Sequence, residues 1–156
     1  MKTLMIAALM SAVVAPPAIA QDRWATFDNG VTARQGAFIC SEMNQETGEF
    51  FCMELACEAG APLAVELSHD GSRLEDVMQA QFTVNGIDLG SHEFQQSKPN
   101  GYAQYASQTA AQDEQLRYWL RNGRSAEIAI GDDVEVMSLA GSSVALAQIF
   151  AACPAG

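Results

Sequence analysis

The clearest fold signal in the chain is the stretch Gln79-Ala80-Gln81-Phe82-Thr83-Val84-Asn85-Gly86-Ile87-Asp88-Leu89. Apolar and polar residues alternate on both sides of Asn85-Gly86, the pair preferred in a two-residue type I′ turn. We therefore predict a β-hairpin in which Val84 lies opposite Ile87 and Phe82 lies opposite Leu89. All four side chains are expected on one buried face, so the framework of the domain should be an antiparallel sheet.

Similar alternation, broken by turn-forming residues, marks the other expected strands. They are Gly36 to Met43, Glu49 to Cys57, Ala61 to Leu67, Gly90 to Gln96, Tyr102 to Ala106, Ala126 to Ile130 and Val134 to Leu139. The polar run Asn44 to Gly48 and the acidic run Gly131-Asp132-Asp133 are expected to be hairpin turns.

Two helices are expected in the last third of the chain. Thr109 and Gln112 fit a capping box at the start of the first, and Leu116, Trp119 and Leu120 form its apolar stripe. The second begins near Ser142 or Ser143 and has an apolar stripe along one side. That stripe contains Leu146, Ile149, Phe150 and Cys153. About seven or eight short strands with two helices predict a mainly β domain, an antiparallel β-sandwich of the immunoglobulin-like class.

The first twenty residues have the three parts of a cleavable signal peptide. Lys2 supplies a positive start, Leu4 to Val14 an apolar run, and Ala18-Ile19-Ala20 the small residues before a cut. A membrane-spanning helix needs about 20 apolar residues, and Pro16-Pro17 ends this run sooner. We expect cleavage before Gln21, no stable membrane anchor afterwards, and a single periplasmic or secreted domain over residues 21–156.

The four cysteines are Cys40, Cys52, Cys57 and Cys153, and an even number in a small exported domain predicts two disulfides. Three pairings are possible. In a hairpin centred near Glu46, Cys40 and Cys52 face each other. Cys57 is an odd number of residues from Cys52 and points to the opposite face, which leaves it for Cys153. We predict the pairs Cys40 with Cys52 and Cys57 with Cys153.

The sequence gives little support for a catalytic site. Ser68-His69-Asp70 has the residue types of a triad, but adjacent side chains on a strand point apart, and the same holds for His92 beside Glu93. Asp132, Asp133 and Glu135 could ligate calcium, yet they lack the spacing of an EF-hand, and an acidic turn explains them better. Trp24 and Trp119 could stack on a ligand but fit a core. We expect no catalytic residue, metal or cofactor.

The charge balance restricts the partners. Removing the first twenty residues takes away Lys2 and leaves seven basic against nineteen acidic residues, a formal net charge of −12. Such a surface repels nucleic acid and anionic lipid. A protein or another component of the cell envelope is the expected partner.

The C-terminal part of the chain shows a family resemblance. The run Leu120 to Gly123, the two strands after it and the segment Val136 to Leu146 resemble the ending of invasion-associated locus B-like proteins. These exported alphaproteobacterial proteins share an early Trp, two or more cysteines and a Ser-Leu-x-Gly segment before a helix with Ala-Leu. Trp24, Cys40, Cys52 and Ser138-Leu139-Ala140-Gly141 occupy comparable places. The resemblance implies a periplasmic β-sandwich with a role in host-cell interaction or the envelope, and no catalytic residues.

The sequence thus predicts a non-catalytic binding or envelope-associated module. The alternative is an enzyme or enzyme inhibitor with a site built from loops. A pocket that joins His69 or His92 to a carboxylate would favour the enzyme, and a flat apolar patch with a polar rim would favour the binding module.

Overall fold

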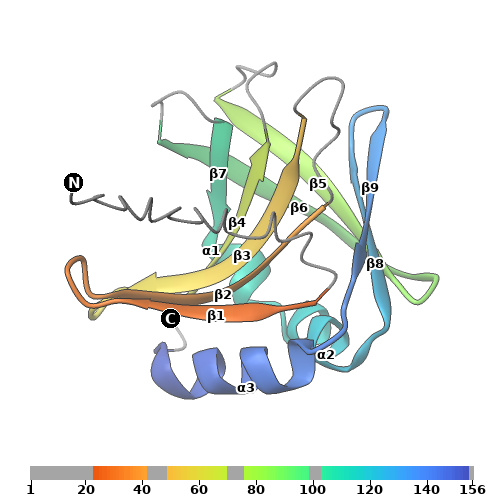
Figure 1. Cartoon of the computed structure of the whole chain (residues 1–156). Helices are drawn as coiled ribbons and strands as arrows, with labels where there is room; N and C mark the ends of the chain where they lie inside the picture. Colours follow the sequence, from red (N-terminus) through yellow and green to blue (C-terminus); the bar gives the residue numbers. More distant parts are fainter. Residues whose placement is uncertain (1–22, 42–48, 70–75, 99–102, 155–156) are drawn as a thin grey trace, which may run out of the picture.

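A computed structural model describes residues 23–41, 49–69, 76–98 and 103–154 (Figure 1). Nine strands and three helices follow one another along these ranges. They are β1 (Ala25–Asn29), β2 (Arg34–Cys40), β3 (Phe51–Glu58), β4 (Ala64–His69), β5 (Val77–Val84), β6 (Ile87–Lys98), β7 (Ala103–Ser107), α1 (Gln108–Gln112), α2 (Glu114–Asn122), β8 (Ser125–Ile130), β9 (Asp133–Ser138) and α3 (Ser142–Ala152).

The strands form one antiparallel sheet in the order β1-β2-β3-β4-β7-β6-β5-β8-β9. The prediction of a mainly β, antiparallel domain is confirmed at this level. Where the sequence predicted the two sheets of a sandwich, the nine strands are hydrogen-bonded into a single sheet. This sheet coils strongly, so that β8 and β9 come round toward β2 and β3 (Figure 1). The coiling lets one sheet enclose a core without a second sheet.

The hairpin around Asn85-Gly86 is confirmed, with one correction. Asn85 and Gly86 both have positive φ, 52° and 78°, as a type I′ turn requires, and Val84 pairs with Ile87. The register then shifts between Gln81 and Thr83. Phe82 therefore does not face Leu89 alone, because the return strand contains an extra residue. Phe82 and Val84 are buried, but Ile87 is 40% exposed, since it lies at the tip beyond the core.

The other predicted strands are present with shifted ends. The first predicted pair is β2 and β3, in register from Arg34 opposite Glu58 to Cys40 opposite Cys52. Its predicted turn, residues 44–48, lies outside the described residues, as do Asp70 and Gly71. Strand β1 was not predicted; it raises the number of strands to nine and pairs Phe27 with Gly36.

The first predicted helix is two helices that meet at Asp113. The cap of α1 is Ser107, whose hydroxyl accepts from the Ala110 amide at 3.2 Å, so Thr109 was the wrong cap. The Asp113 carboxylate caps α2 by accepting from the amides of Gln115 and Leu116 at 2.8 and 3.0 Å. The last predicted helix is confirmed as α3. In the described ranges, no helix has the length and apolar character needed to cross a membrane.

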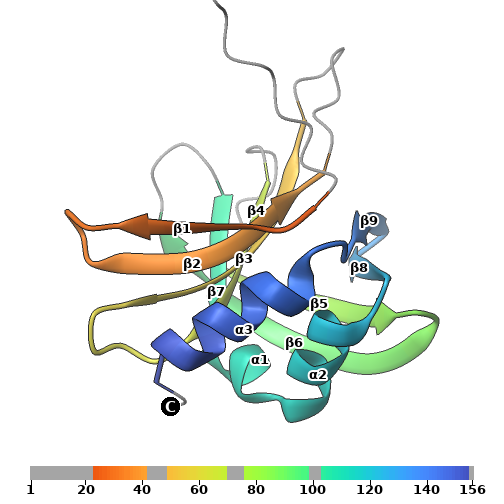
Figure 2. The same ribbon diagram turned by 60° about the horizontal axis from the view of Figure 1, so that its bottom comes forward.

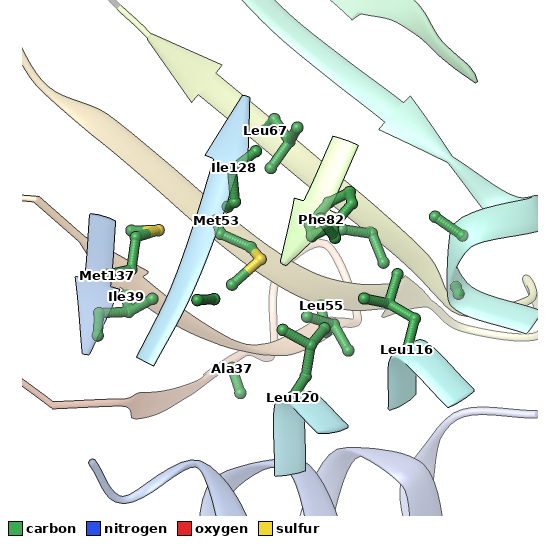
Figure 3. Packing of buried hydrophobic residues seen from close by; sticks show 14 of the residues in the cluster. Ala37, Ile39, Met53, Leu55, Leu67, Phe82, Leu116, Leu120, Ile128 and Met137 are labelled. Atoms are coloured by element: carbon green, nitrogen blue, oxygen red, sulfur yellow. The ribbon is translucent and has the colours of Figure 1, made fainter. Parts of the chain in front are cut away.

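The core fills the inside of the coiled sheet. Figure 3 shows Ile39, Met53 and Leu67 from the first half of the sheet meeting Phe82 and Ile128 from the second half. Leu116 and Leu120 of α2 close one end, and both are fully buried. The three helices lie together at this end (Figure 2). The opposite face of the sheet is left for polar groups and for any partner.

Candidate functional site

Both disulfides form as predicted. The Cys40–Cys52 bond, with Cα atoms 4.0 Å apart, links directly opposed positions of β2 and β3. The Cys57–Cys153 bond, with Cα atoms 5.8 Å apart, joins β3 to the end of α3. All four cysteines are oxidised. None of them supplies a thiolate, so a cysteine nucleophile is absent in this state.

The structure does not assemble a triad from Ser68, His69 and Asp70. Ser68 and His69 are successive residues of β4, and their partners in β3 are Cys52 and Phe51. Asp70 lies outside the described residues.

His92 does meet a carboxylate, but not the neighbouring Glu93. Its Nε2 lies 3.5 Å from Asp113 Oδ2, and its ring packs edge-to-face on Phe82 with the centroids 5.9 Å apart. The His92 side chain is only 12% exposed. The other carboxylate oxygen of Asp113 is the cap of α2. This pair therefore fixes the start of a helix on the sheet.

A polar cluster crosses four neighbouring strands on the outer face of the sheet. Arg34 of β2 contacts Glu54 of β3 at 2.5 Å and Glu66 of β4 at 2.9 Å. The Gln104 amide of β7 donates to Glu66 at 2.5 Å. The side chains of Arg34, Glu54 and Glu66 are each 20% exposed or less. One guanidinium thus neutralises two carboxylates on opposed positions of β3 and β4.

The pKa of Arg34 responds to this environment. Burial acts to lower it, but the charges of Glu54 and Glu66 and their hydrogen bonds outweigh burial and raise the pKa above its usual value. Phe27 covers the guanidinium, whose carbon lies 5.3 Å from the ring centroid. The same ring lies over Gly36, where an added Cβ would come within 2.6 Å of it. The cluster is thus satisfied internally, as expected of a structural group.

A small pocket of about 190 Å³ lies beside the second disulfide. Its lining combines apolar Leu63, Ala111 and Pro154 with the polar side chains of Glu114 and Arg117 and with Cys153. The Arg117 guanidinium stacks on Phe150 at 4.3 Å from the ring centroid. Neither His92 nor Asp113 lines this pocket, so it does not join a histidine to a carboxylate.

The remaining candidate residues from the sequence lie in the core or near a turn. Trp24 is buried, and Trp119 packs against the core, as predicted. Asp132 lies in the two-residue turn between β8 and β9, and Asp133 is the first residue of β9. Across the described residues, no three His, Cys, Asp or Glu side chains are grouped to hold a metal ion.

Strand β9, the last strand of the sheet, exposes two apolar side chains. Val134 and Val136 are 57% and 63% exposed and lie on one face, opposite Ala129 and Glu127 of β8. The polar Glu127 lies beside Val136 on the neighbouring strand. The alternating sequence predicted this strand but not its exposure, because alternation does not reveal which strand is last in the sheet.

Among the described residues, no strand pairs with β9 on the side away from β8. The amide of Leu139 donates to the carbonyl of Arg124 at 2.9 Å. In an antiparallel pair, the backbone groups of every second residue, counted back from Leu139, therefore point toward β8. The amides and carbonyls of Val134 and Val136 therefore face the other side. On that side, a hydrogen bond forms just beyond the end of the strand, where the Ala140 carbonyl accepts from the Trp24 amide at 2.9 Å.

Comparisons of this chain with protein-family models, with curated proteins and with solved structures found no match.

Proposed function

We propose that this protein is an exported, non-catalytic binding module of the periplasm or cell envelope, and that it holds an extended segment of a partner protein along β9. The observation that carries the proposal is the open edge of β9 with its two exposed valines. An exposed sheet edge is a template for a further strand, which main-chain hydrogen bonds hold in register.

The chemistry of β9 indicates the kind of segment it accepts. The backbone groups of Val134 and Val136 can bond to an added strand, and their side chains can pack against its apolar residues. Asp133 and Glu135 lie on the same strand, and Glu127 lies beside Val136. The partner strand is therefore expected to alternate apolar residues with Lys or Arg.

Export and family membership belong to the same proposal. The two disulfides support an oxidising compartment. The apolar run before Pro16 supports a signal peptide, and the resemblance to invasion-associated locus B-like proteins supports a role at the envelope or in host-cell contact. A sandwich description is also proposed for the packing of the two halves of the coiled sheet, which meet across the core in Figure 3.

The alternative, an enzyme or enzyme inhibitor, has one observation in its favour, the His92–Asp113 pair. No serine or cysteine thiolate accompanies this pair in the contacts of the described residues, and helix capping accounts for its carboxylate. Replacing both His69 and His92 by Ala should leave the fold and the biological activity nearly unchanged. A large loss of activity in a variant that keeps its far-UV circular dichroism would favour the enzyme.

The strand-addition proposal can be tested with proline. In Val136→Pro the lost amide faces the open side, so the β8–β9 ladder is retained while an added strand loses a hydrogen bond and meets the ring. Val136→Thr keeps the amide and the branched shape and is the matched control. Thr26→Pro is a second control, because its amide faces the open side of β1.

The measurement is capture of partners from periplasmic extract by the oxidised protein, followed by hydrogen exchange of the complex. The wild type, Val136→Thr and Thr26→Pro should capture the same protein, and Val136→Pro should not. Exchange at the Val134 and Val136 amides should slow in the complex. Equal capture by Val136→Pro, or unchanged exchange at these amides, would overturn the proposal.

A further inference from the structure

The few basic residues of this acidic protein are gathered at one end. The described ranges contain six, and Arg34 is neutralised by Glu54 and Glu66. Lys98 ends β6. The other four border helices α2 and α3; they are Arg23, Arg117, Arg121 and Arg124. Four of the six basic residues in the described ranges therefore lie at the helical end of the domain, together with the acidic Asp113 and Glu114.

Three of these residues converge on the turn between β9 and α3. The carbonyl of Arg121 accepts from the Ser142 hydroxyl at 3.2 Å, and the carbonyl of Arg124 accepts from the Leu139 amide at 2.9 Å. The Cβ of Arg23 lies 3.8 Å from the place where a Cβ on Gly141 would be. Arg23, Arg121 and Arg124 are all exposed. We name these three residues the basic rim.

The helix beside the basic rim has no charged residue from Ser142 to Ala152. It nevertheless lies on the surface, where Val144 is 65% exposed. Its neighbour α2 exposes Tyr118 to 59%, one turn before Arg121, and the two helices lie side by side (Figure 2). A surface helix of a soluble domain usually has a charged outer face, so an uncharged outer face bordered by arginines indicates an interaction surface.

We propose that this end of the domain rests on an anionic phospholipid bilayer. Arginines contact lipid phosphates, tyrosines favour the level of the headgroups, and an uncharged helix face can enter the interface at little cost. The basic rim, Tyr118 and Val144 supply these three elements. The sequence before Arg23, with its apolar run from Leu4 to Val14, also joins the domain at the basic rim.

Screening reconciles this contact with the negative net charge. At physiological ionic strength the Debye length is about 8 Å, so acidic side chains on the far side of the domain are screened while the basic rim touches the bilayer. At about 0.01 M salt the length is about 30 Å, and the whole negative domain is repelled. At about 1 M salt the arginine contacts are themselves screened. Binding should therefore be strongest at intermediate salt.

The test is co-sedimentation of the oxidised protein with vesicles of equal parts phosphatidylglycerol and phosphatidylcholine, compared with pure phosphatidylcholine. We expect binding to the anionic vesicles alone. Each arginine near such a surface is worth about a fivefold change in partitioning, so Arg121→Gln with Arg124→Gln should weaken binding about 25-fold. Val144→Asp should also weaken it.

The matched control is Val136→Asp, which places the same substitution on β9, away from the helices. It should bind vesicles like the wild type, which separates this proposal from partner binding at β9. Thermal unfolding of each variant checks that the fold is kept. No binding to anionic vesicles, or equal binding by the double glutamine variant, would overturn the proposal. Capture of an acidic protein through the basic rim without vesicle binding would also overturn it.

Discussion

The amide of Trp24 donates a 2.9 Å hydrogen bond to the carbonyl of Ala140 and so joins the two outermost strands of the sheet. Trp24 comes just before β1, and Ala140 comes just after β9. The coiled sheet is closed at this point, while further along β9 keeps an open edge. Gly141, with φ of 80°, then turns the chain into α3 next to the backbone of Trp24. The open edge and the basic rim therefore begin from the same junction.

The two disulfides should differ in their contribution to stability. Cys57–Cys153 closes a separation of 96 residues and Cys40–Cys52 one of 12. The chain-entropy model gives about 4 to 5 kcal/mol for the first and about 3 kcal/mol for the second. Because a domain is stable by only about 5 to 15 kcal/mol, Cys57→Ala with Cys153→Ala should be near unfolding, while Cys40→Ala with Cys52→Ala should fold. Urea unfolding measures both, and equal losses would contradict the expectation.

Removing the arginine between the two glutamates should be costly at neutral pH. Arg34→Met leaves Glu54 and Glu66 opposed and largely buried, and we expect a loss of about 2 to 3 kcal/mol. Because the pKa of Arg34 is raised in the folded protein, its stabilising contribution is fully present at neutral pH and is lost only as the pH rises through that raised pKa.

In the variant the penalty should shrink as the pH falls through the glutamate range near 4, because protonation relieves the repulsion. Urea unfolding at pH 7 and pH 4 measures this change. The triple variant Arg34→Met, Glu54→Gln, Glu66→Gln is the control and should recover most of the stability at pH 7. A loss that is the same at both pH values would show that packing on Phe27, rather than charge, is responsible.

The caps of α1 and α2 distinguish the observed helix starts from the predicted one. Asp113→Ala and Ser107→Ala should each cost about 1 kcal/mol, whereas Thr109→Ala should be close to neutral. Asp113→Asn keeps the cap and should retain most of the stability. Thermal unfolding of the four variants is sufficient. A larger loss for Thr109→Ala than for Ser107→Ala would restore the original capping box.

The signal peptide prediction has a direct readout. Mass spectrometry of the exported protein should find Gln21, or its cyclised form, as the N-terminus. Intact Met1 on the exported chain would refute cleavage. It would also mean that the basic rim stays joined to the apolar run.

Much of this fold could be predicted from the sequence because turn conformation and strand alternation depend on residues close together in the chain. Asn85-Gly86 requires two positive φ values, and the equal distances of Cys40 and Cys52 from their turn placed them opposite each other. The odd spacing of Cys52 and Cys57 held because β3 is unbroken between them. This parity assigned the long-range disulfide before any contact was known.

What the sequence did not show depends on tertiary position. Ile87 has the same alternation as Val84, and only its place at a hairpin tip leaves it exposed. Asp113 interrupts the expected helix because its carboxylate caps α2 and approaches His92, a residue far away in sequence. The candidate site on β9 depends on strand order, which neither periodicity nor composition encodes.

The strand order also bears on when the chain can fold. β4 pairs with β7, β5 pairs with β8, and Cys57 waits for Cys153 near the end of the sequence. These two pairings and the long-range disulfide are therefore unavailable to a partly emerged chain, and loop closure must precede them. The six pairings between consecutive strands are local, but the sheet that encloses the core is complete only once β8 and β9 are present. The bond between Cys57 and Cys153 then fixes the end of α3 to β3 in the finished domain.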